Sequence, residues 1–297
     1  MVYQSYKIVS INTSNPSRSP SVCNLENFDV IGNILDTARN IQDEAIVCKL
    51  SATILNNDLL LDSFINNIKL LSLTGAKVLI IHDISEIIES SIDLFGIKIP
   101  KDGVYDYKSS QILEMIVSGY INKKIVSLMC NNNINAIGIS CKDCNLIRAQ
   151  KFAKPSKNQK ILNIKFDALP IMVNPEALAS LFDSNMVVVC SPIASTTDNT
   201  TCILNTNLTA SLLASTLGAK YLIFPNNTSH KELNKIFSNE NKEILESHIN
   251  SNNTITNIDL YGAALNAIEN YVENVSIIDE SDPKALINSI FSINKCV

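Results

Sequence analysis

The sequence predicts an α/β protein, a three-layer α/β/α sandwich with a mainly parallel central sheet. Short and almost continuously apolar runs recur along the chain, which is typical of strands buried on both faces. Segments with apolar residues at helical spacing separate these runs, so right-handed crossovers would connect parallel neighbours. The expected strands are Ala45–Leu50, Lys77–His82, Ile134–Ser140, Met186–Cys190, Lys220–Phe224 and Val275–Ile278.

The helices expected between these strands place apolar residues three or four positions apart. The longest, Ser110–Cys130, would bury a face that includes Met115, Ile116 and Ile125. Asp58 is the expected N-cap of the second helix, and alternation through Lys165–Leu169 predicts exposed antiparallel strands. The expected helices are Leu25–Arg39, Leu59–Leu73, Ile84–Leu94, Ser110–Cys130, Pro175–Phe182, Asn207–Leu217, Ile258–Val272 and Pro283–Phe291.

Composition predicts a globular protein with a substantial core. The chain has 297 residues, of which 46% are hydrophobic and 18% charged, and its net charge is -5. This negative charge gives no general attraction to nucleic acid or to an anionic membrane. Because no apolar stretch reaches the about 18 residues of a membrane span, we expect a cytoplasmic protein.

Glycine is scarce, and this excludes the commonest phosphate-binding loops. The chain has 8 glycines, where average usage would give about 20. No two lie close enough to form a G-x-G-x-x-G turn or a Walker A loop. Any nucleotide phosphate must therefore be held without a cluster of glycine amides.

The cysteines predict no metal site. Cys141 and Cys144 form a CxxC pair, but no second pair completes a zinc-binding set. Two small residues on a tight turn are the favoured interpretation over redox or metal chemistry.

Several ordered motifs resemble those of N-acetylglutamate kinases. The stretch Glu114–Val126 is similar to the central helix of that family, and Ala136–Ile147 resembles its "VGLSGKDGNLI" segment. Val275–Asp279 resembles its "VHIID" strand, and Val173–Glu176 and Ser191–Ile193 also match. Order and spacing agree from about Asn27 to the C-terminus.

The resemblance implies an amino-acid kinase fold and the family reaction. In that reaction ATP with Mg²⁺ phosphorylates the side-chain carboxylate of N-acetyl-L-glutamate, a step in arginine biosynthesis. It implies an acyl amino-acid lobe at residues 44–185 and a nucleotide lobe at 186–297. A flexible tail, 1–24, and an N-terminal helix, 25–43, would precede them.

The N-terminal helix is similar to one that interlaces dimers into a ring in arginine-sensitive, hexameric members. Residues Asn27–Arg39 would supply it here, which makes a homodimer or hexamer an open expectation. An amphipathic helix packed on its own domain is the equal alternative.

The phosphate chemistry implied by the family needs cations and amide donors around the transferred group. Lys49 stands at the first of the family's two lysine positions, at the end of a predicted strand. The expected second lysine falls at Leu260, beside Asp259. The aspartate that orients both lysines falls at Asn207. One cation of the set is therefore retained.

The glycine loops of the family are replaced. Its Gly-Gly after the first lysine reads Ser51-Ala52, and its "HGGG" turn begins with His82, Asp83 and Ile84. We expect strain at Ile84, since the turn favours positive φ, and Asp83 would place a negative charge near an anion. For His82, pairing with Asp83 or substrate and a structural role both stay open.

The substrate and nucleotide positions also differ. The arginine that clamps the substrate's α-carboxylate falls at Gly103, although Lys101 or Lys108 could reach in. In the family's "NxNAD" segment, Asn205 is kept and the first asparagine is Ile203. Its "LTDV" nucleotide turn reads Pro225-Asn226-Asn227-Thr228.

Three functional hypotheses stay open. The first is an acetylglutamate kinase-like enzyme with weak or altered activity. The second is an inactive pseudokinase that serves as a regulatory or oligomeric binding protein. The third is a kinase for another acid, with Lys101, Lys108 or Lys220 as a relocated cation. They separate on whether a lysine reaches the cleft opposite Lys49.

Overall fold

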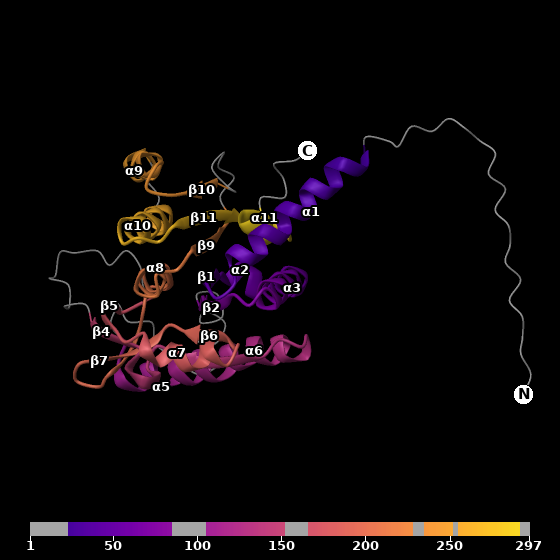
Figure 1. Ribbon diagram of the computed structural model, residues 1–297. Coiled ribbons are helices and arrows are strands. Elements are labelled where there is room, and N and C mark those ends of the chain that lie inside the picture. Colours follow the sequence, from indigo (N-terminus) through magenta and orange to yellow (C-terminus); the bar gives the residue numbers. More distant parts are fainter. Residues whose placement is uncertain (1–22, 85–104, 152–165, 228–234, 252–254, 292–297) are drawn as a thin grey trace, which may run out of the picture.

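A seven-stranded sheet forms the centre of the molecule (Figure 1). The computed structural model describes residues 23–84, 105–151, 166–227, 235–251 and 255–291. The strand order is β10-β11-β9-β1-β2-β6-β3, and neighbouring strands are parallel except for β10 against β11. The predicted mainly parallel sheet is confirmed. Its strands are β1 (Ala45–Leu50), β2 (Lys77–His82), β3 (Ala136–Ser140), β6 (Val187–Ser191), β9 (Tyr221–Asn226), β10 (Lys235–Phe237) and β11 (Asn274–Asp279).

A second, four-stranded sheet lies beside the first, in the order β5-β4-β7-β8. Its strands are β4 (Ile147–Lys151), β5 (Ala168–Val173), β7 (Ile193–Thr196) and β8 (Thr201–Ile203). Strands β4 and β5 pair antiparallel, and Ile171 and Met172 of β5 are exposed. The expected exposed antiparallel strands are therefore present, although β5 begins beyond Lys165.

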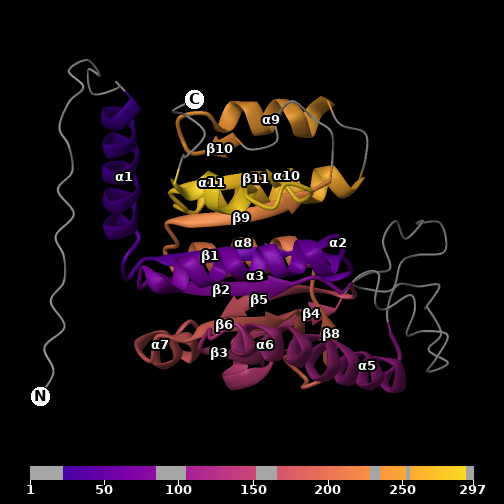
Figure 2. The ribbon, with the colours of Figure 1, turned by 90° about the vertical axis from the view of Figure 1, so that its right-hand side faces the viewer.

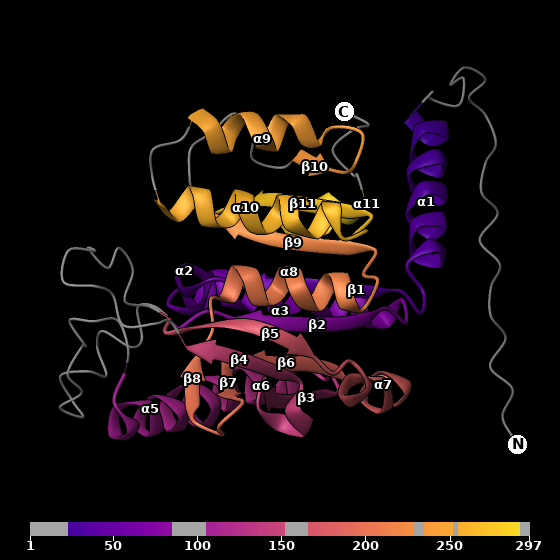
Figure 3. The same ribbon diagram turned by 90° about the vertical axis from the view of Figure 1, so that its left-hand side faces the viewer.

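Helices cover both faces of the central sheet, which confirms the sandwich. One face packs against α1 (Cys23–Asn40), α3 (Asp58–Leu73), α6 (Asn122–Asn131) and α11 (Ala285–Phe291) (Figure 2). The other packs against α7 (Glu176–Asp183), α8 (Thr206–Thr216), α10 (Ile255–Glu269) and the second sheet (Figure 3). Helix α9 (Lys242–Ser251) packs on α10. Each face carries its own apolar core.

Several expected helix starts differ from the structure by a few residues, among them those of α1 and α3. Helix α1 begins at Cys23, inside the segment expected to be a tail. The N-cap of α3 is Asn57 and not Asp58, because the Asn57 side chain accepts bonds from Leu59 N and Leu60 N. Asp58 instead lies in the first turn, where its charge faces the positive end of the helix dipole. The expected helix Ile84–Leu94 lies outside the described residues except for Ile84.

The long central helix is not a uniform α-helix. It comprises α5 (Tyr107–Glu114), a π-helical segment (Met115–Ile121) and α6. The wider π turn shifts the phase of the apolar face, so Met115 is 63% exposed where burial was expected. Ile116 and Ile125 are buried as expected.

The start of α6 lies very close to β3. The Asn122 side chain is fully buried and donates to the carbonyls of Val189 (2.9 Å) and Ile139 (3.3 Å). Lys123 Nζ donates to the Gly138 carbonyl at 2.7 Å. A Cβ at Gly138 would meet Asn122 Oδ1 at 1.9 Å. Glycine is therefore required at this position.

Gly138→Ala is expected to lower the free energy of unfolding by about 1–3 kcal/mol, because an overpacked core must shift its neighbours. Urea unfolding measures this change. Gly262→Ala is the matched control, since a Cβ there meets nothing within 4 Å and alanine is the better helix former. Equal effects of the two substitutions would contradict the close approach.

Candidate functional site

The candidate site lies at the edge of the sheet where the parallel strands end, the usual ligand-binding edge of such sheets. Lys49 is the last residue but one of strand β1, and His82 ends β2 beside Leu50. The backbone N–H of Asp83 donates to the Leu50 carbonyl at 2.7 Å, which extends the ladder by one residue. The structure therefore brings Lys49, His82 and Asp83 together at this edge.

Lys49 forms an ion pair with a carboxylate of the chain itself. Its Nζ lies 3.4 Å from Asp83 Oδ2, and the two side chains are only 10% and 19% exposed. The other oxygen, Asp83 Oδ1, accepts the backbone N–H of Ile84 at 2.7 Å. One carboxylate thus contacts both the cation and the amide at the end of β2.

The strain expected at Ile84 is absent. Ile84 is not among the described residues with positive φ. Its side chain is 2% exposed and belongs to the core beside α3. Ile84 points into the core, and its backbone does not adopt the left-handed conformation that a β-branched residue disfavours.

The loop after Lys49 forms a helical turn in place of a glycine-rich cradle. Ser51 is the N-cap of the short helix α2 (Ala52–Leu55), and its Oγ accepts the Ile54 N–H at 3.3 Å. The same hydroxyl donates to Glu280 Oε2 at 2.6 Å, although the two residues are far apart in sequence. Glu280 is 6% exposed and follows β11. The end of β1 is thereby tied to the end of β11.

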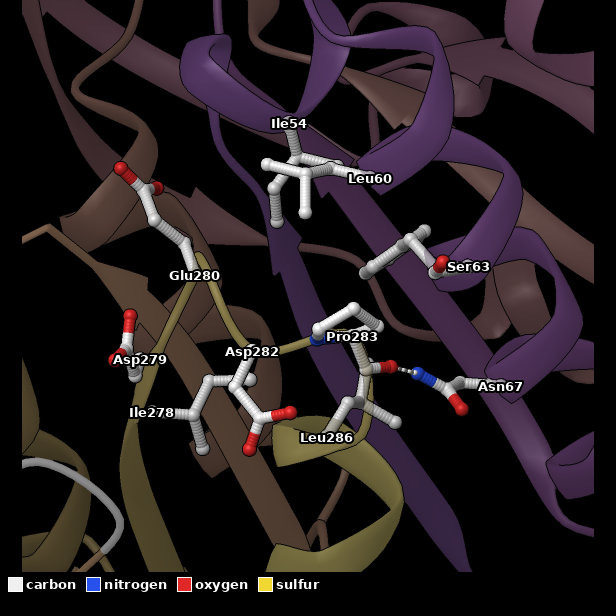
Figure 4. A pocket seen from close by; sticks show the side chains of 11 residues that line it. Ile54, Leu60, Ser63, Asn67, Ile278, Asp279, Glu280, Asp282, Pro283 and Leu286 are labelled. Atoms are coloured by element: carbon white, nitrogen blue, oxygen red, sulfur yellow. Dashed lines mark hydrogen bonds between the residues drawn. The ribbon is translucent and has the colours of Figure 1, made fainter.

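A narrow cleft opens between α2, α3 and the segment after β11 (Figure 4). The carboxylates of Asp279, Glu280 and Asp282 lie along one side, and Asn67 Nδ2 donates to the Pro283 carbonyl at 2.8 Å across it. Its floor is apolar, and no basic side chain is among the described residues that line it. The cleft is therefore unsuited to an anionic ligand.

The start of α8 lies next to this edge. Asn205 is the N-cap of α8, since its Oδ1 accepts the Leu208 N–H at 3.0 Å, so the retained asparagine has a structural role. Ile203 is fully buried in the core. Asn207 Oδ1 is buried and has no hydrogen-bond partner among the described residues. Because asparagine is neutral, this position carries no charge that could orient a lysine.

Asp167, an acidic residue that the sequence analysis did not single out, lies next to Ile203. Asp167 is fully buried, forms an ion pair with Lys151 Nζ at 3.2 Å and accepts the Ile203 N–H at 2.7 Å. Burial raises the pKa of Asp167, while these donors lower it. The alternation through Lys165–Leu169 indicated a strand but gave no sign of this pairing.

The other predicted positions supply no cation to the site. Leu260 is 5% exposed in the core formed by α8 and α10, and burial raises the pKa of its neighbour Asp259. Asn226 ends β9 and its carbonyl accepts the Glu280 N–H at 3.2 Å, while Asn227 is exposed. Gly103 lies outside the described residues.

Of the candidate relocated lysines, Lys220 does not face Lys49. Lys220 lies at the opposite edge of the sheet, where its Nζ donates to the Asn40 carbonyl and lies 4.0 Å from Glu44. Lys108 is exposed on α5. Lys101 lies outside the described residues.

His82 has a structural environment. It is fully buried, with Nε2 3.3 Å from Asn122 Nδ2 and Nδ1 3.2 Å from the Asp83 carbonyl. This pairing fits a neutral ring that donates from Nδ1. Burial lowers the pKa of His82 to about 4, against the opposing effects of Asp83. His82 therefore connects β2 to the central helix rather than to a ligand.

The CxxC pair forms a tight turn, as expected. Cys144 is exposed, and its backbone φ is 50°. Cys141 is buried, and its Sγ lies 3.5 Å from Cys190 Sγ. Asp143 accepts from both the backbone and the hydroxyl of Ser140, which shapes the turn. No group of three metal-ligating side chains gathers in the described part of the chain.

The residues at this edge do not fit the phosphate end of a magnesium nucleotide. Stabilising a transferred phosphoryl group needs uncompensated positive charge and open amide donors. Here Asp83 compensates Lys49 and occupies the Ile84 amide. Glu280 adds a second carboxylate at Ser51.

Comparison with known proteins places this arrangement in a family. The model of the amino acid kinase family matches residues 44–279. An acetylglutamate kinase from Campylobacter hominis is 32% identical over 273 residues, which cover 90% of this chain and 94% of the relative. The chain belongs to the acetylglutamate kinase group of the amino acid kinase family. Another acetylglutamate kinase, from Archaeoglobus fulgidus, is 28% identical over 285 residues, 90% of this chain and 97% of that one.

Solved structures of other proteins share the fold of this chain. N-acetylglutamate synthase from Neisseria gonorrhoeae, complexed with coenzyme A and N-acetyl-glutamate, matches with a TM-score of 0.69 at 15% identity. The match covers 89% of this chain and 61% of the synthase chain. Carbamate kinase from Giardia lamblia bound to AMP-PNP matches with a TM-score of 0.55 at 14% identity, over 85% and 95% of the two chains. None of the described helices is both long and apolar enough to cross a bilayer.

The pH dependence of stability should reveal the buried His82. Its pKa falls from 6.5 to about 4 on folding, so the unfolded state binds a proton first as the pH is lowered. Stability contributed by neutral His82 is complete above pH 6.5 and is lost toward pH 4, by about 3 kcal/mol. Chemical unfolding at several pH values should give a shallower acid slope for His82→Gln than for the unsubstituted protein. Parallel slopes would show that His82 is exposed to solvent.

Proposed function

We propose that this chain is an acetylglutamate kinase-like protein whose ATP-dependent phosphorylation of N-acetyl-L-glutamate is weak or lost. Membership of the family supports the substrate and nucleotide assignment. The observation that carries the reduced activity is the position of Leu260, which lies 5% exposed in the core where the family's second lysine is expected. Leucine carries no charge, so no change of its rotamer can supply the missing cation.

The charge around Lys49 supports the same proposal. The transferred phosphoryl group carries its charge on the equatorial oxygens, and cations that meet it only in the transition state accelerate the reaction. Lys49 is paired with Asp83, and Asn207 is uncharged. Loss of one transition-state donor lowers kcat by about a hundredfold or more. Losses within one set of groups do not simply add.

A specific substitution experiment tests the proposal. With N-acetyl-L-glutamate and MgATP, we expect kcat at least a hundredfold below the about 1–100 s⁻¹ typical of kinases. Because the residual rate owes little to a neutralised lysine, Lys49→Ala should lower it no more than Lys77→Ala, a matched substitution at the opposite end of the adjacent strand. The rate of ADP release measures kcat for the unsubstituted protein and for the two variants. An ordinary kcat that only Lys49→Ala abolishes would contradict the proposal.

Calorimetric titration separates weak catalysis from a pseudokinase. The protein is titrated with MgATP, with and without saturating N-acetyl-L-glutamate. Binding of both ligands together with slow ADP release supports a weak enzyme. Binding without ADP release supports an inactive binding protein, and heat from neither, in a protein that unfolds cooperatively, contradicts the ligand assignment.

Assembly into a homodimer or hexamer through α1 is the second proposal, and the exposed face of α1 supports it. Helix α1 stands at the edge of the molecule (Figure 3) and contacts α11. Ile34 and Ala38 pack on the core, whereas Ile31 and Leu35 are 53% and 54% exposed. A second copy of the chain would cover these two apolar side chains. Such an assembly agrees with the role of the similar helix in ring-forming members.

Light scattering coupled to gel filtration tests the assembly. We expect a mass at least twice the 32.6 kDa of the chain, and we expect Ile31→Ser with Leu35→Ser to reduce it. Met172→Ser is the control, since Met172 is 64% exposed on β5 of the second sheet. A monomer in the unsubstituted protein, or an unchanged mass in the double variant, would contradict assembly through α1.

A further inference from the structure

We infer that Asp83 is a specificity-determining residue that acts as an internal anion and keeps phosphate-type oxyanions away from Lys49. This inference deepens the proposed function, on which it rests, by naming the side chain that excludes a phosphoryl group from this edge.

The two oxygens of Asp83 occupy two donors at once. Oδ2 lies 3.4 Å from Lys49 Nζ, and Oδ1 accepts the Ile84 N–H at 2.7 Å. A cation and a backbone amide that converge on two oxygens of one anionic group form the usual protein recognition of an oxyanion. The carboxylate therefore fills an oxyanion site that the chain itself has built.

The backbone holds this carboxylate in place. Asp83 N–H donates to the Leu50 carbonyl at 2.7 Å, so the residue is fixed to the end of β1, the strand that carries Lys49. His82, immediately before it, is fully buried and anchored to Asn122. Asp83 therefore remains next to Lys49 without paying a large entropic cost, and a free anion must compete with an attached one.

The burial of the ion pair favours Asp83 over a free phosphate as the partner of Lys49. The Lys49 side chain is 10% exposed and that of Asp83 is 19% exposed, so solvent screens the pair only weakly. A phosphate that approached Lys49 would meet the Asp83 carboxylate within the same contact distance. Glu280, hydrogen-bonded to Ser51 two residues after Lys49, repels it further.

Removing the charge of Asp83 should open the site. In Asp83→Asn the side-chain oxygen can still accept the Ile84 N–H, while Lys49 loses its counter-ion. Isothermal calorimetry with inorganic phosphate should show binding at least about tenfold tighter than in the unsubstituted protein. Adding Lys49→Met to Asp83→Asn should abolish the gain, because the gain requires the cation.

Asp282→Asn is the matched control. It removes one negative charge at the same end of the sheet, but the Asp282 carboxylate accepts the Lys284 N–H and lines the cleft beyond β11. We expect its phosphate affinity to stay that of the unsubstituted protein. Asp83→Ser, which also removes the charge, is a second variant in case the amide disturbs folding, and circular dichroism melts check both.

Two outcomes would overturn the inference. One is phosphate binding by Asp83→Asn and Asp83→Ser that is no tighter than by Asp282→Asn. The other is a gain in affinity that persists after Lys49→Met. Phosphate binding is measured without any turnover, so a fast reaction in the unsubstituted protein would refute the proposed function and leave the gain at Asp83→Asn to be judged separately.

Discussion

The burial of the central sheet on both faces is the constraint on which the rest of the structure depends. Strands β1, β2 and β6 present side chains to two apolar cores and leave no free face. A buried polar group without a partner destabilises the fold, so the interior of these strands is restricted to apolar residues. Functional groups can stand only where the strands end, and Lys49, His82 and Asp83 stand there.

The same constraint determines what the strand ends can contribute. The residues at the ends of β1 and β2 lie close to the core, and the side chains there pack inward or pair with a neighbour. Ile84 packs inward, His82 pairs with Asn122, and Lys49 pairs with Asp83. The edge thereby becomes stable without a ligand. A site shaped for catalysis normally keeps some of these groups unpaired until its substrate arrives.

The sheet and most helices could be predicted because their signals are local. Apolar runs such as Lys77–His82 match their strands, since continuous burial leaves few other interpretations. The N-cap of α3 was wrong by one residue because Asn57 and Asp58 are both good caps. The π turn at Met115 was missed, because one extra residue per turn leaves the composition unchanged. The Asp167–Lys151 and Ser51–Glu280 pairs join distant segments, which no local pattern indicates.

The backbone amides near the site show how the edge differs from a phosphate cradle. A glycine loop leaves its N–H groups open so that a ligand can complete them. Here the chain completes two of them itself: Ser51 accepts the Ile54 N–H, and Asp83 accepts that of Ile84. Each acceptor is a side chain that glycine lacks. A serine or an aspartate at such an edge, where a phosphate cradle would have glycine, occupies a donor and adds an acceptor in one step. It satisfies the backbone within the chain and offers fewer open N–H groups to an anion.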